Sequence, residues 1–512
     1  MRLDELTAGL GVLTAGALDG ATEITGLAYD SRAVRGGELF FCVSGFERDG
    51  HEFAPQAVAA GAAALVVERP LGLGLPELLV GSARAAMAPV AARFYGDPTS
   101  QLRVVGITGT NGKTTTAYLV RALLEAAGEQ CGLLGTVKSV IAGEDRPVVR
   151  TTPEAIELQR DFREMLDGGD RACAMEVSSH ALELGRADAI EFAGAVFTNL
   201  TQDHLDFHDT MEDYFLAKRR LFVDCAPAVS VVNVGDVYGR RLAGELERVR
   251  TFAVDAEADF SASELDCDLS GCSFTLRSPA APARRVRLPM PGRFNVANAL
   301  GALLLVHELL GGERLPELLA ALEAGVHVPG RFEPVEEGQD FAVLVDYAHT
   351  PDSLENVLSS ARELIERGQR GDGRVVCVFG AGGDRDRGKR PLMGEIAARL
   401  ADVALVTSDN PRSEDPQQII AEIMAGVARV QAGAPEAQAE PDSGTHASPP
   451  VRSIADRALA IDEAIAAARA GDVVVIAGKG HEQGQELAAG RKVPFDDATV
   501  ARKALRVRGA RR

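Results

Sequence analysis

The chain has 512 residues, of which 46% are hydrophobic and 25% are charged, so we expect a soluble globular protein of about three domains. Its formal net charge of −20 argues against a broad phosphate-binding surface for DNA or RNA, although a few placed Arg and Lys can still bind a small anion. No apolar stretch reaches membrane-spanning length and no signal peptide is visible, which predicts a cytoplasmic protein without membrane insertion. Seven scattered cysteines without a CxxC pair predict a reducing compartment with buried, inert thiols.

Residues 1–97 are predicted to form a small α/β domain. Strand patterns at 24–32, 38–45 and 62–68 alternate with helix patterns at 53–61 and 82–95. The turn-forming residues 96–100 that follow are typical of a linker.

Residues 98–330 are predicted to form a second domain. A β-branched strand pattern at 102–108 leads through a glycine-rich turn into a helix pattern at 114–128, and a helix at 295–310 closes the domain. Further strand patterns at 172–177, 193–200 and 229–234 alternate with helices. This alternation predicts βαβ units and a mainly parallel sheet.

Residues 331–512 repeat the alternation. Strand patterns at 341–349, 374–383, 401–411 and 472–481 all carry polar residues at their carboxyl ends, the edge at which open α/β sheets bind ligands. Residues 433–450 are rich in Pro, Ala and small polar residues, which predicts a mobile surface insertion.

The strongest motif lies between the strand at 102–108 and the next helix. A glycine-rich turn in this place points backbone N–H groups at phosphate oxygens. Lys113 would pair with the β/γ-phosphates and the Thr114 hydroxyl would bind Mg²⁺. The spacing departs from a standard phosphate-binding loop because Ile107 stands where the first glycine is expected, yet the Gly-Lys-Thr-Thr ending disfavours a plain turn. The predicted nucleotide contacts are Gly109, Thr110, Asn111, Gly112, Lys113, Thr114 and Thr115.

This loop resembles that of the Mur ligases and the folylpolyglutamate synthetases. Further segments similar to the Mur ligase family follow in the family's order over nearly the whole chain: MEVSSH at 175–180, TNLTQDHLDFH at 198–208, GRFE at 330–333, DYAHTP at 346–351, GGDR at 382–385 and GKGHE at 478–482. The resemblance implies three α/β domains: a uridine-nucleotide domain (1–97), a P-loop ATPase domain (98–330) and a Rossmann-like amino-acid-binding domain (331–512).

The resemblance implies metal and catalytic roles for Glu176, His204 and Lys218 beside Lys113 and Thr114. A carboxylate and an imidazole suit a second Mg²⁺ that bridges the γ-phosphate and a substrate carboxylate. Taken alone, His204 reads more simply as a histidine paired with a neighbouring carboxylate, and Lys218 as a solvated lysine. In the family this lysine is carbamylated by CO₂ and becomes a carboxylate-like metal ligand, which requires a neutral, desolvated amine.

Three further positions match those that hold the nucleotide in relatives. Asn298 can read adenine, Asp346 can accept from ribose hydroxyls, and Arg331 can reach the phosphates. Helix packing is the alternative role for Asn298.

The resemblance also implies where a uridine nucleotide-sugar substrate binds. Ser31 matches the uridine diphosphate-binding turn of the first domain. The sequence departs from some relatives at Arg150 and Leu184. The central-domain contacts to the sugar-peptide arm are expected at Thr151, Thr152, Ser178 and Arg186.

The segment Asp409-Asn410-Pro411-Arg412 accompanies meso-diaminopimelate addition in this family. Arg412 can fork onto the distal carboxylate, which lysine lacks, and a site built to pair a polar group rejects analogues without it. A turn is the alternative, since Asn-Pro is a turn signal. The resemblance adds Arg385, Gly478 and Glu482 to this pocket, with Glu482 holding the distal ammonium. Arg385 also stands where a dinucleotide-binding GxGxxG would need glycine, which excludes that motif at 380–385.

The implied reaction is the ATP- and Mg²⁺-dependent addition of meso-diaminopimelate to the D-Glu γ-carboxylate of UDP-MurNAc-L-Ala-D-Glu through an acyl phosphate, by a monomer without a nucleic-acid partner. Three alternatives are open: a ligase of the same superfamily that adds lysine or acts as a folylpolyglutamate synthetase, a non-catalytic nucleotide-binding switch, and a P-loop motor or transporter ATPase. The last is disfavoured by the candidate metal ligands Glu176 and His204.

Overall fold

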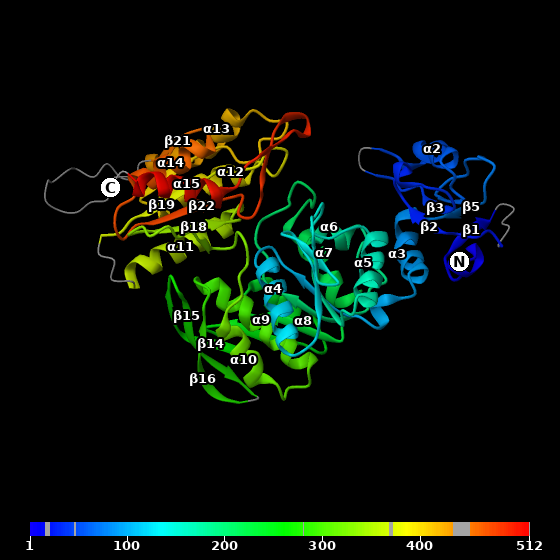
Figure 1. Ribbon diagram of the computed structural model, residues 1–512, viewed down its shortest axis with the longest axis horizontal. Coiled ribbons are helices and arrows are strands. Elements are labelled where there is room, and N and C mark those ends of the chain that lie inside the picture. The colour runs from blue at the N-terminus through cyan, green and yellow to red at the C-terminus, as the bar shows by residue number, and fades with distance from the viewer. Residues whose placement is uncertain (16–20, 46–47, 280, 368–371, 434–450, 511–512) are drawn as a thin grey trace. The chain divides into compact units, whose positions relative to one another are not determined.

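The computed structural model describes residues 1–15, 21–45, 48–279, 281–367, 372–433 and 451–510 (Figure 1). These residues form two compact units that are interleaved in sequence. The first unit comprises residues 1–108, 128–196 and 216–230, and the second 109–127, 197–215 and 231–512. Residues 434–450 of the predicted insertion lie outside the described residues, whereas Gly433 ends helix α13. None of the described helices has the length and apolar composition needed to cross a membrane.

The first unit begins with a five-stranded sheet in the order β1-β5-β4-β3-β2, in which only β1 runs antiparallel to its neighbour. Successive residues of β3 point to opposite faces, so that Leu39 and Phe41 pack against α1 and α3 while Phe40 packs on the side of α2. Ser82 caps α3 by accepting from the Ala85 N–H. The elements are α1 (Leu3–Leu6), β1 (Val12–Ala15), β2 (Gly26–Ala28), β3 (Glu38–Phe41), α2 (Ala54–Ala59), β4 (Ala64–Val67), β5 (Glu77–Val80) and α3 (Ala83–Phe94).

The rest of the first unit is a sheet in the order β11-β6-β10-β7-β8-β9. Strands β6 and β10 pair in parallel, as predicted. Strands β7, β8 and β9 were not predicted: β7 pairs in parallel with β10, and β8 and β9 add an antiparallel edge. The elements are β6 (Arg103–Thr108), β7 (Cys131–Leu134), β8 (Ser139–Ile141), β9 (Glu144–Arg146), α5 (Ala155–Asp167), β10 (Ala172–Glu176), α6 (Ser179–Glu183) and β11 (Phe192–Phe197). Helix α7 (Met211–Val223) has residues in both units.

The second unit contains strands in the order β16-β15-β14-β13-β12. The ribbon β14–β16 is antiparallel and was not predicted. Cys267 and Cys272 face each other across the β14–β15 hairpin, 4.0 Å apart between Cα atoms, and form a disulfide. The prediction of free thiols is therefore wrong for this pair, because adjacent strands bring together cysteines that are not spaced as CxxC. The elements are α4 (Lys113–Ala126), β12 (Val229–Asn233), α8 (Val237–Glu245), β13 (Arg250–Val254), β14 (Phe260–Asp268), β15 (Gly271–Ser278), β16 (Ala281–Leu288), α9 (Arg293–Leu309) and α10 (Leu315–Ala324).

A six-stranded sheet in the order β17-β18-β22-β19-β20-β21 forms the carboxyl-terminal part of the second unit (Figure 1). Its central strands are Val- and Ile-rich and buried on both faces, as expected of a parallel sheet between helices. Val375 and Val473 pack on the side of α11–α13, whereas Val376 and Val474 pack on that of α14 and α15. The elements are β17 (Glu333–Pro334), β18 (Ala342–Asp346), α11 (Pro351–Arg367), β19 (Val375–Phe379), α12 (Lys389–Leu400), β20 (Val403–Val406), α13 (Pro416–Gly433), β21 (Val451–Ser453), α14 (Arg457–Ala467), β22 (Val473–Ala477), β23 (Gly484–Glu486), β24 (Lys492–Pro494) and α15 (Asp497–Gly509).

A buried ion pair joins the two helices on one face of this sheet. Arg457 at the start of α14 donates to both carboxylate oxygens of Asp497 at 2.8 and 2.7 Å, and both side chains are 0% exposed. Arg457 also donates to the carbonyl of Ala477, the last residue of β22. The pair therefore fixes α14, α15 and the end of β22 together.

Replacing Arg457 by Met should destabilise the second unit by about 3–5 kcal/mol, because Asp497 would be left as an unpaired buried carboxylate. Hydrogen exchange of the β22 amides would measure the loss. The matched control is Arg429→Ala, which removes an exposed pair with Glu395 and should cost less than about 1 kcal/mol. Equal effects of the two substitutions would contradict the structural importance of the buried pair.

Candidate functional site

The loop between β6 and α4 contains two glycines in tightly packed positions. Gly109 and Gly112 have φ angles of +147° and +84°. A Cβ at Gly109 would overlap the Thr198 hydroxyl, and one at Gly112 would overlap the side-chain oxygen of Asn298. Only glycine fits both positions. Helix α4 begins directly after this loop, and the positive end of its dipole suits an anion there.

Two cationic side chains lie against this loop. Lys113 donates to the carbonyls of Gly109 and Thr110 at 3.0 and 2.8 Å. Arg331 donates to the Thr114 hydroxyl at 2.8 Å. The structure thus brings together the predicted loop residues and Arg331, and the close approach of Asn298 to Gly112 places that predicted residue there too.

Asp346 ends β18 and is buried. Its two oxygens accept from the N–H groups of Phe332, at 2.6 Å, and Ala348, at 2.8 Å. Burial raises the pKa of Asp346 to about 6, although the Arg331 guanidinium opposes the shift. The Arg331 guanidinium in turn stacks 4.4 Å from the centre of the Tyr347 ring.

His204 lies next to a buried carboxylate. Its Nε2 is 3.4 Å from Asp203, and His349 and Lys389 each approach Asp203 to 3.9 Å. Burial alone would raise the pKa of Asp203, but these neighbours hold it well below its usual range. The carboxylate pairing considered as an alternative for His204 is therefore present, and its role as a metal ligand stays a prediction.

Within the described ranges, no group of three or more His, Cys, Asp or Glu side chains is arranged to hold a metal ion. The predicted magnesium set has only two residues of these types, Glu176 and His204. It relies for its other ligands on the Thr114 hydroxyl and a carbamate.

In the first unit, Glu176 ends β10 and is 1% exposed. It accepts from the N–H and the hydroxyl of Thr136, at 2.8 and 3.0 Å, and the Thr136 hydroxyl is 3.1 Å from that of Thr151. The Thr152 hydroxyl donates to the Glu176 carbonyl and accepts from the Ser178 N–H. The predicted residues thus meet at the end of one strand. Thr136 was missed, because a lone threonine after a glycine carries no sequence signal.

Arg186 joins the same group. It donates to the carbonyl of Thr152 at 3.2 Å and pairs with Glu154 at 2.9 Å. Burial lowers the pKa of Arg186, against the pull of Glu154. Glu154 was not predicted; as the N-cap of α5 it could have been found from the capping pattern of the helix.

Two other predicted residues of the first unit are buried. Ser31 is 7% exposed, and its hydroxyl donates to Gln56 of α2 at 2.9 Å. Lys218 in α7 is 1% exposed, which excludes the solvated lysine considered above. Gln56 was not predicted as a neighbour of the substrate turn.

The segment 409–412 follows β20 and the segment 478–482 follows β22, and the structure brings them together. Lys479, fully buried, donates to the Asn410 side-chain oxygen at 2.9 Å and to Glu482 at 2.8 Å. The Asn410 amide donates to the same Glu482 oxygen at 2.8 Å. A Cβ at Gly478 would overlap the Asp409 carboxylate, so this glycine permits the close approach. Lys479 was missed, although it stands inside a predicted motif.

Arg412 has a φ of +49°, in the left-handed region that non-glycine residues rarely adopt. Its Nη1 donates to the Gly383 carbonyl at 2.8 Å and its Nε to Glu486 at 3.0 Å. Arg385 is exposed and donates to the neighbouring Asp384 carbonyl at 3.0 Å. Both arginines adjoin Gly382. Glu486 was not predicted.

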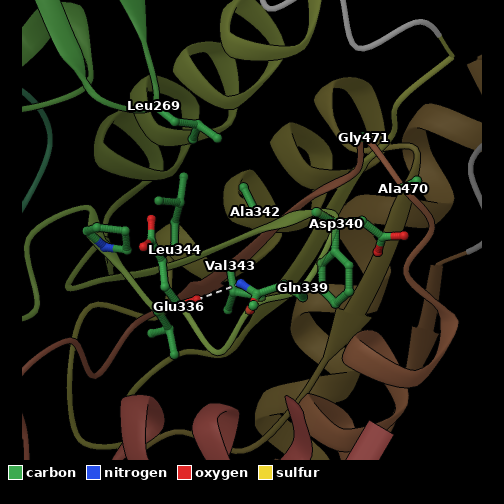
Figure 2. Close-up of a pocket in the computed structure, with 13 residues that line it drawn as sticks. Leu269, Glu336, Gln339, Asp340, Ala342, Val343, Leu344, Ala470 and Gly471 are labelled. Carbon is green, nitrogen blue, oxygen red and sulfur yellow. Dashed lines mark hydrogen bonds between the residues drawn. The ribbon is translucent and has the colours of Figure 1, made fainter. Parts of the chain in front are cut away.

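A separate cavity of about 740 Å³ lies at the amino end of β18 (Figure 2). Ala342, Val343 and Leu344 of that strand line it together with Gly471, and Gln339 donates to the Val335 carbonyl beside it. None of the predicted site residues lines this cavity, because they follow the opposite ends of the same parallel strands.

Three family descriptions match the chain. They are "Mur ligase family, catalytic domain" over residues 23–95, "Mur ligase middle domain" over 107–306 and "Mur ligase, glutamate ligase domain" over 330–480. A UDP-N-acetylmuramoyl-L-alanyl-D-glutamate–2,6-diaminopimelate ligase of Geobacillus kaustophilus is 45% identical over 501 residues, 96% of each chain. The ligase of the same name from Streptomyces coelicolor is 45% identical over 98% of this chain and 96% of its own.

Solved structures agree with these matches. A structure of a ligase of the same name superposes with a TM-score of 0.68 at 32% identity and covers 99% of both chains. A Mycobacterium tuberculosis folylpolyglutamate synthase, complexed with ADP and AMPPCP, superposes with a TM-score of 0.60 at 19% identity, over 83% of this chain and 94% of its own. The second likeness shows a shared fold only.

The raised pKa of Asp346 predicts a pH dependence of stability. Its folded-state pKa of about 6 lies above its ordinary value of 3.8, so the folded chain binds more protons between these values. The contribution of Asp346 to the free energy of unfolding is thus greatest below about pH 4 and is lost as the pH rises through about 6. Urea denaturation across this range should show wild type losing about 2–3 kcal/mol relative to Asp346→Asn. Parallel curves for wild type and this variant would contradict the prediction; Asp372→Asn, at an exposed position, is the control.

Proposed function

The chain belongs to the Mur ligase family, and from this premise we propose that it adds meso-2,6-diaminopimelate to UDP-MurNAc-L-Ala-D-Glu, with cleavage of ATP to ADP and phosphate. One observation carries the proposal: ligases named for this reaction share 45% of their residues with the chain over nearly its whole length. The three matched segments fit three domains, whose boundaries we place near residues 97 and 330. We further propose that the protein works as a cytoplasmic monomer in peptidoglycan precursor synthesis.

The loop around Gly109 and Gly112 suits the triphosphate of ATP. Positive φ angles at Gly109 and Gly112 shape the turn between β6 and α4, and a glycine-rich strand-to-helix turn of this kind binds phosphate. Lys113 and Arg331 supply positive charge beside it, and each would exchange its present loop contacts for phosphate oxygens. Asn298 and Asp346 would hold the adenosine.

The donor set fits magnesium. Thr114, Glu176, His204 and a carbamylated Lys218 would offer mostly oxygen ligands, which Mg²⁺ prefers, and Glu176 is already oriented by two bonds from Thr136. When bound, Mg²⁺ supplies charge neutralisation for the transferring phosphoryl group. Lys113 would stabilise the negative charge on the same phosphoryl group.

The chemistry proposed for the substrates is carboxyl activation followed by amide formation. The D-Glu γ-carboxylate attacks the γ-phosphorus of ATP, and ADP leaves. The amine of meso-diaminopimelate then attacks the acyl carbon, loses a proton, and phosphate leaves. Ser31 would bind the uridine diphosphate, while Thr151, Thr152, Ser178 and Arg186 would position the sugar-peptide arm.

Amino-acid choice would lie in the pocket at 409–412 and 478–482. Arg412 would bind the distal carboxylate with help from Arg385, and Glu482 would accept from the distal ammonium. The buried Lys479 keeps Glu482 and Asn410 in fixed positions, which favours one arrangement of substrate groups.

The direct test is phosphate release coupled to a new amide bond. The purified chain receives ATP, Mg²⁺ and UDP-MurNAc-L-Ala-D-Glu, then either meso-diaminopimelate or L-lysine, with the product weighed by mass spectrometry. We expect kcat/KM to be at least about 100-fold higher for meso-diaminopimelate, because lysine leaves the carboxylate-binding groups unmatched. Chelation of Mg²⁺ should abolish the reaction.

Lys113→Ala should lower kcat by about 100-fold or more, since it removes charge from the phosphoryl site. Lys138→Ala, at a lysine paired with Asp145, is the matched control and should leave kcat unchanged. An equal kcat/KM for L-lysine would contradict selection of meso-diaminopimelate and would favour a related ligase that adds another amino acid. Nucleotide binding without amide formation under any combination would mean a binding switch.

The burial of Lys218 supports the carbamate, which forms only on a neutral amine. Incubation with ¹³C-bicarbonate should give a carbamate carbon signal by NMR that disappears in Lys218→Ala and persists in Lys138→Ala. A signal that survives in Lys218→Ala, or none in wild type, would sink this assignment.

A further inference from the structure

A short hairpin, β23–β24, lies beside segment 409–412 of the proposed amino-acid pocket. Its last paired residue on the first strand, Glu486, lies opposite Lys492 on the second. Three bonds tie the hairpin to segment 409–412: the Glu486 N–H donates to the Asn410 side chain, the Arg412 N–H to the Glu486 carbonyl, and the Gln485 side chain to the Asp409 carbonyl. The backbone of Glu486 is therefore fixed against the pocket.

The side chain of Glu486 lies on the group proposed to read the substrate. Its carboxylate accepts from Arg412 Nε at 3.0 Å. The opposite edge of the guanidinium is held by the Gly383 carbonyl, so the position and plane of Arg412 are set from two sides. Arg412 and Glu486 are 22% and 33% exposed, so neither charge is sealed from water.

We propose that Glu486 is a specificity-determining residue. In the free enzyme its carboxylate occupies the position on the Arg412 guanidinium that the distal carboxylate of the amino-acid substrate takes on binding. This inference rests on the proposed function of Arg412. The chemistry is an exchange of one carboxylate for another on a guanidinium, which no covalent step accompanies.

The exchange follows from charge and exposure. A substrate carboxylate cannot lie beside Glu486 on the same guanidinium edge without repulsion between two anions. Because the Glu486 side chain is already one-third exposed, it can turn into solvent at small cost while its backbone bonds remain. The substrate carboxylate therefore binds more weakly than it would if Glu486 carried no charge, because the Arg412–Glu486 attraction is lost when it binds.

The two amino acids should feel this competition differently. meso-Diaminopimelate must displace Glu486, whereas L-lysine, which has no distal carboxylate, leaves the Arg412–Glu486 pair in place. Removing the charge of Glu486 should thus favour meso-diaminopimelate alone. A Glu486 that instead held the distal ammonium of the substrate would give the opposite result.

The test is Glu486→Gln, with steady-state kinetics at saturating ATP and UDP-MurNAc-L-Ala-D-Glu. We expect KM for meso-diaminopimelate to fall about threefold, the scale of a partly exposed ion pair, with kcat and the KM for L-lysine unchanged. The matched control is Glu337→Gln, which breaks the carboxylate–arginine pair with Arg506 on the same unit and should change no KM.

A second variant separates this competition from a structural role. In an Arg412→Ala background, Glu486→Gln should have no further effect on KM, since the two residues act through one contact. A KM for meso-diaminopimelate that rises or stays unchanged in Glu486→Gln, or one that falls equally in the Arg412→Ala background, overturns the inference alone. A wild-type chain that forms no amide with meso-diaminopimelate overturns the proposed function and this inference with it.

Discussion

The close approach of two side chains to two loop glycines is the constraint on which the site depends. Thr198 and Asn298 come so near to Gly109 and Gly112 that neither glycine could carry a Cβ. Thr198 also donates to the Asn111 carbonyl at 2.6 Å, and Asn199 accepts from the Asn111 N–H at 2.9 Å. The carbonyl and amide of Asn111 are thereby occupied, and the loop cannot relax into an ordinary turn. In our proposal, an anion would bind to the backbone around these glycines, with the cationic side chains of Lys113 and Arg331 beside it.

Much of this arrangement was predictable because it follows from strand ends. Parallel strands bring their carboxyl ends to one edge, so the polar residues after the patterns at 102–108, 172–177, 401–411 and 472–481 had to gather at sheet edges. The contacts of Thr136, Glu154 and Glu486 could not be predicted in this way. Thr136 lies in a loop, Glu154 caps a helix and Glu486 ends the short strand β23, and the partner of each is set by how distant segments meet. The alternation of Cys272, Phe274 and Leu276 with polar residues could have indicated strand β15, whereas the disulfide depends on the register of β14 and β15.

Buried charges give the proposed amino-acid pocket a rigid frame. Arg457 holds the carbonyl of Ala477, the residue directly before Gly478, while its pair with Asp497 secures it between two helices. One residue beyond Gly478, the buried ammonium of Lys479 donates to Asn410 and Glu482. Because an unpaired buried cation is costly, each of these contacts is hard to break separately. The pocket is thus fixed where strand β22 ends.

The two charge pairs of that pocket differ in their exposure to solvent, and this difference indicates which pair a ligand could open. At one end, Lys479 is 0% exposed and Glu482 is 30% exposed, so their pair is half sealed and Glu482 is held in one orientation. At the other end, Arg412 and Glu486 both reach solvent, and water can replace either partner. A pair that must stay formed benefits from burial, because desolvation makes separation expensive. A pair that opens when a ligand binds must instead be exposed to solvent, because water has to hydrate the released carboxylate. The exposure of the cation, 0% for Lys479 and 22% for Arg412, therefore separates the pair that builds the proposed pocket from the pair that a substrate would replace, whereas the two carboxylates are almost equally exposed.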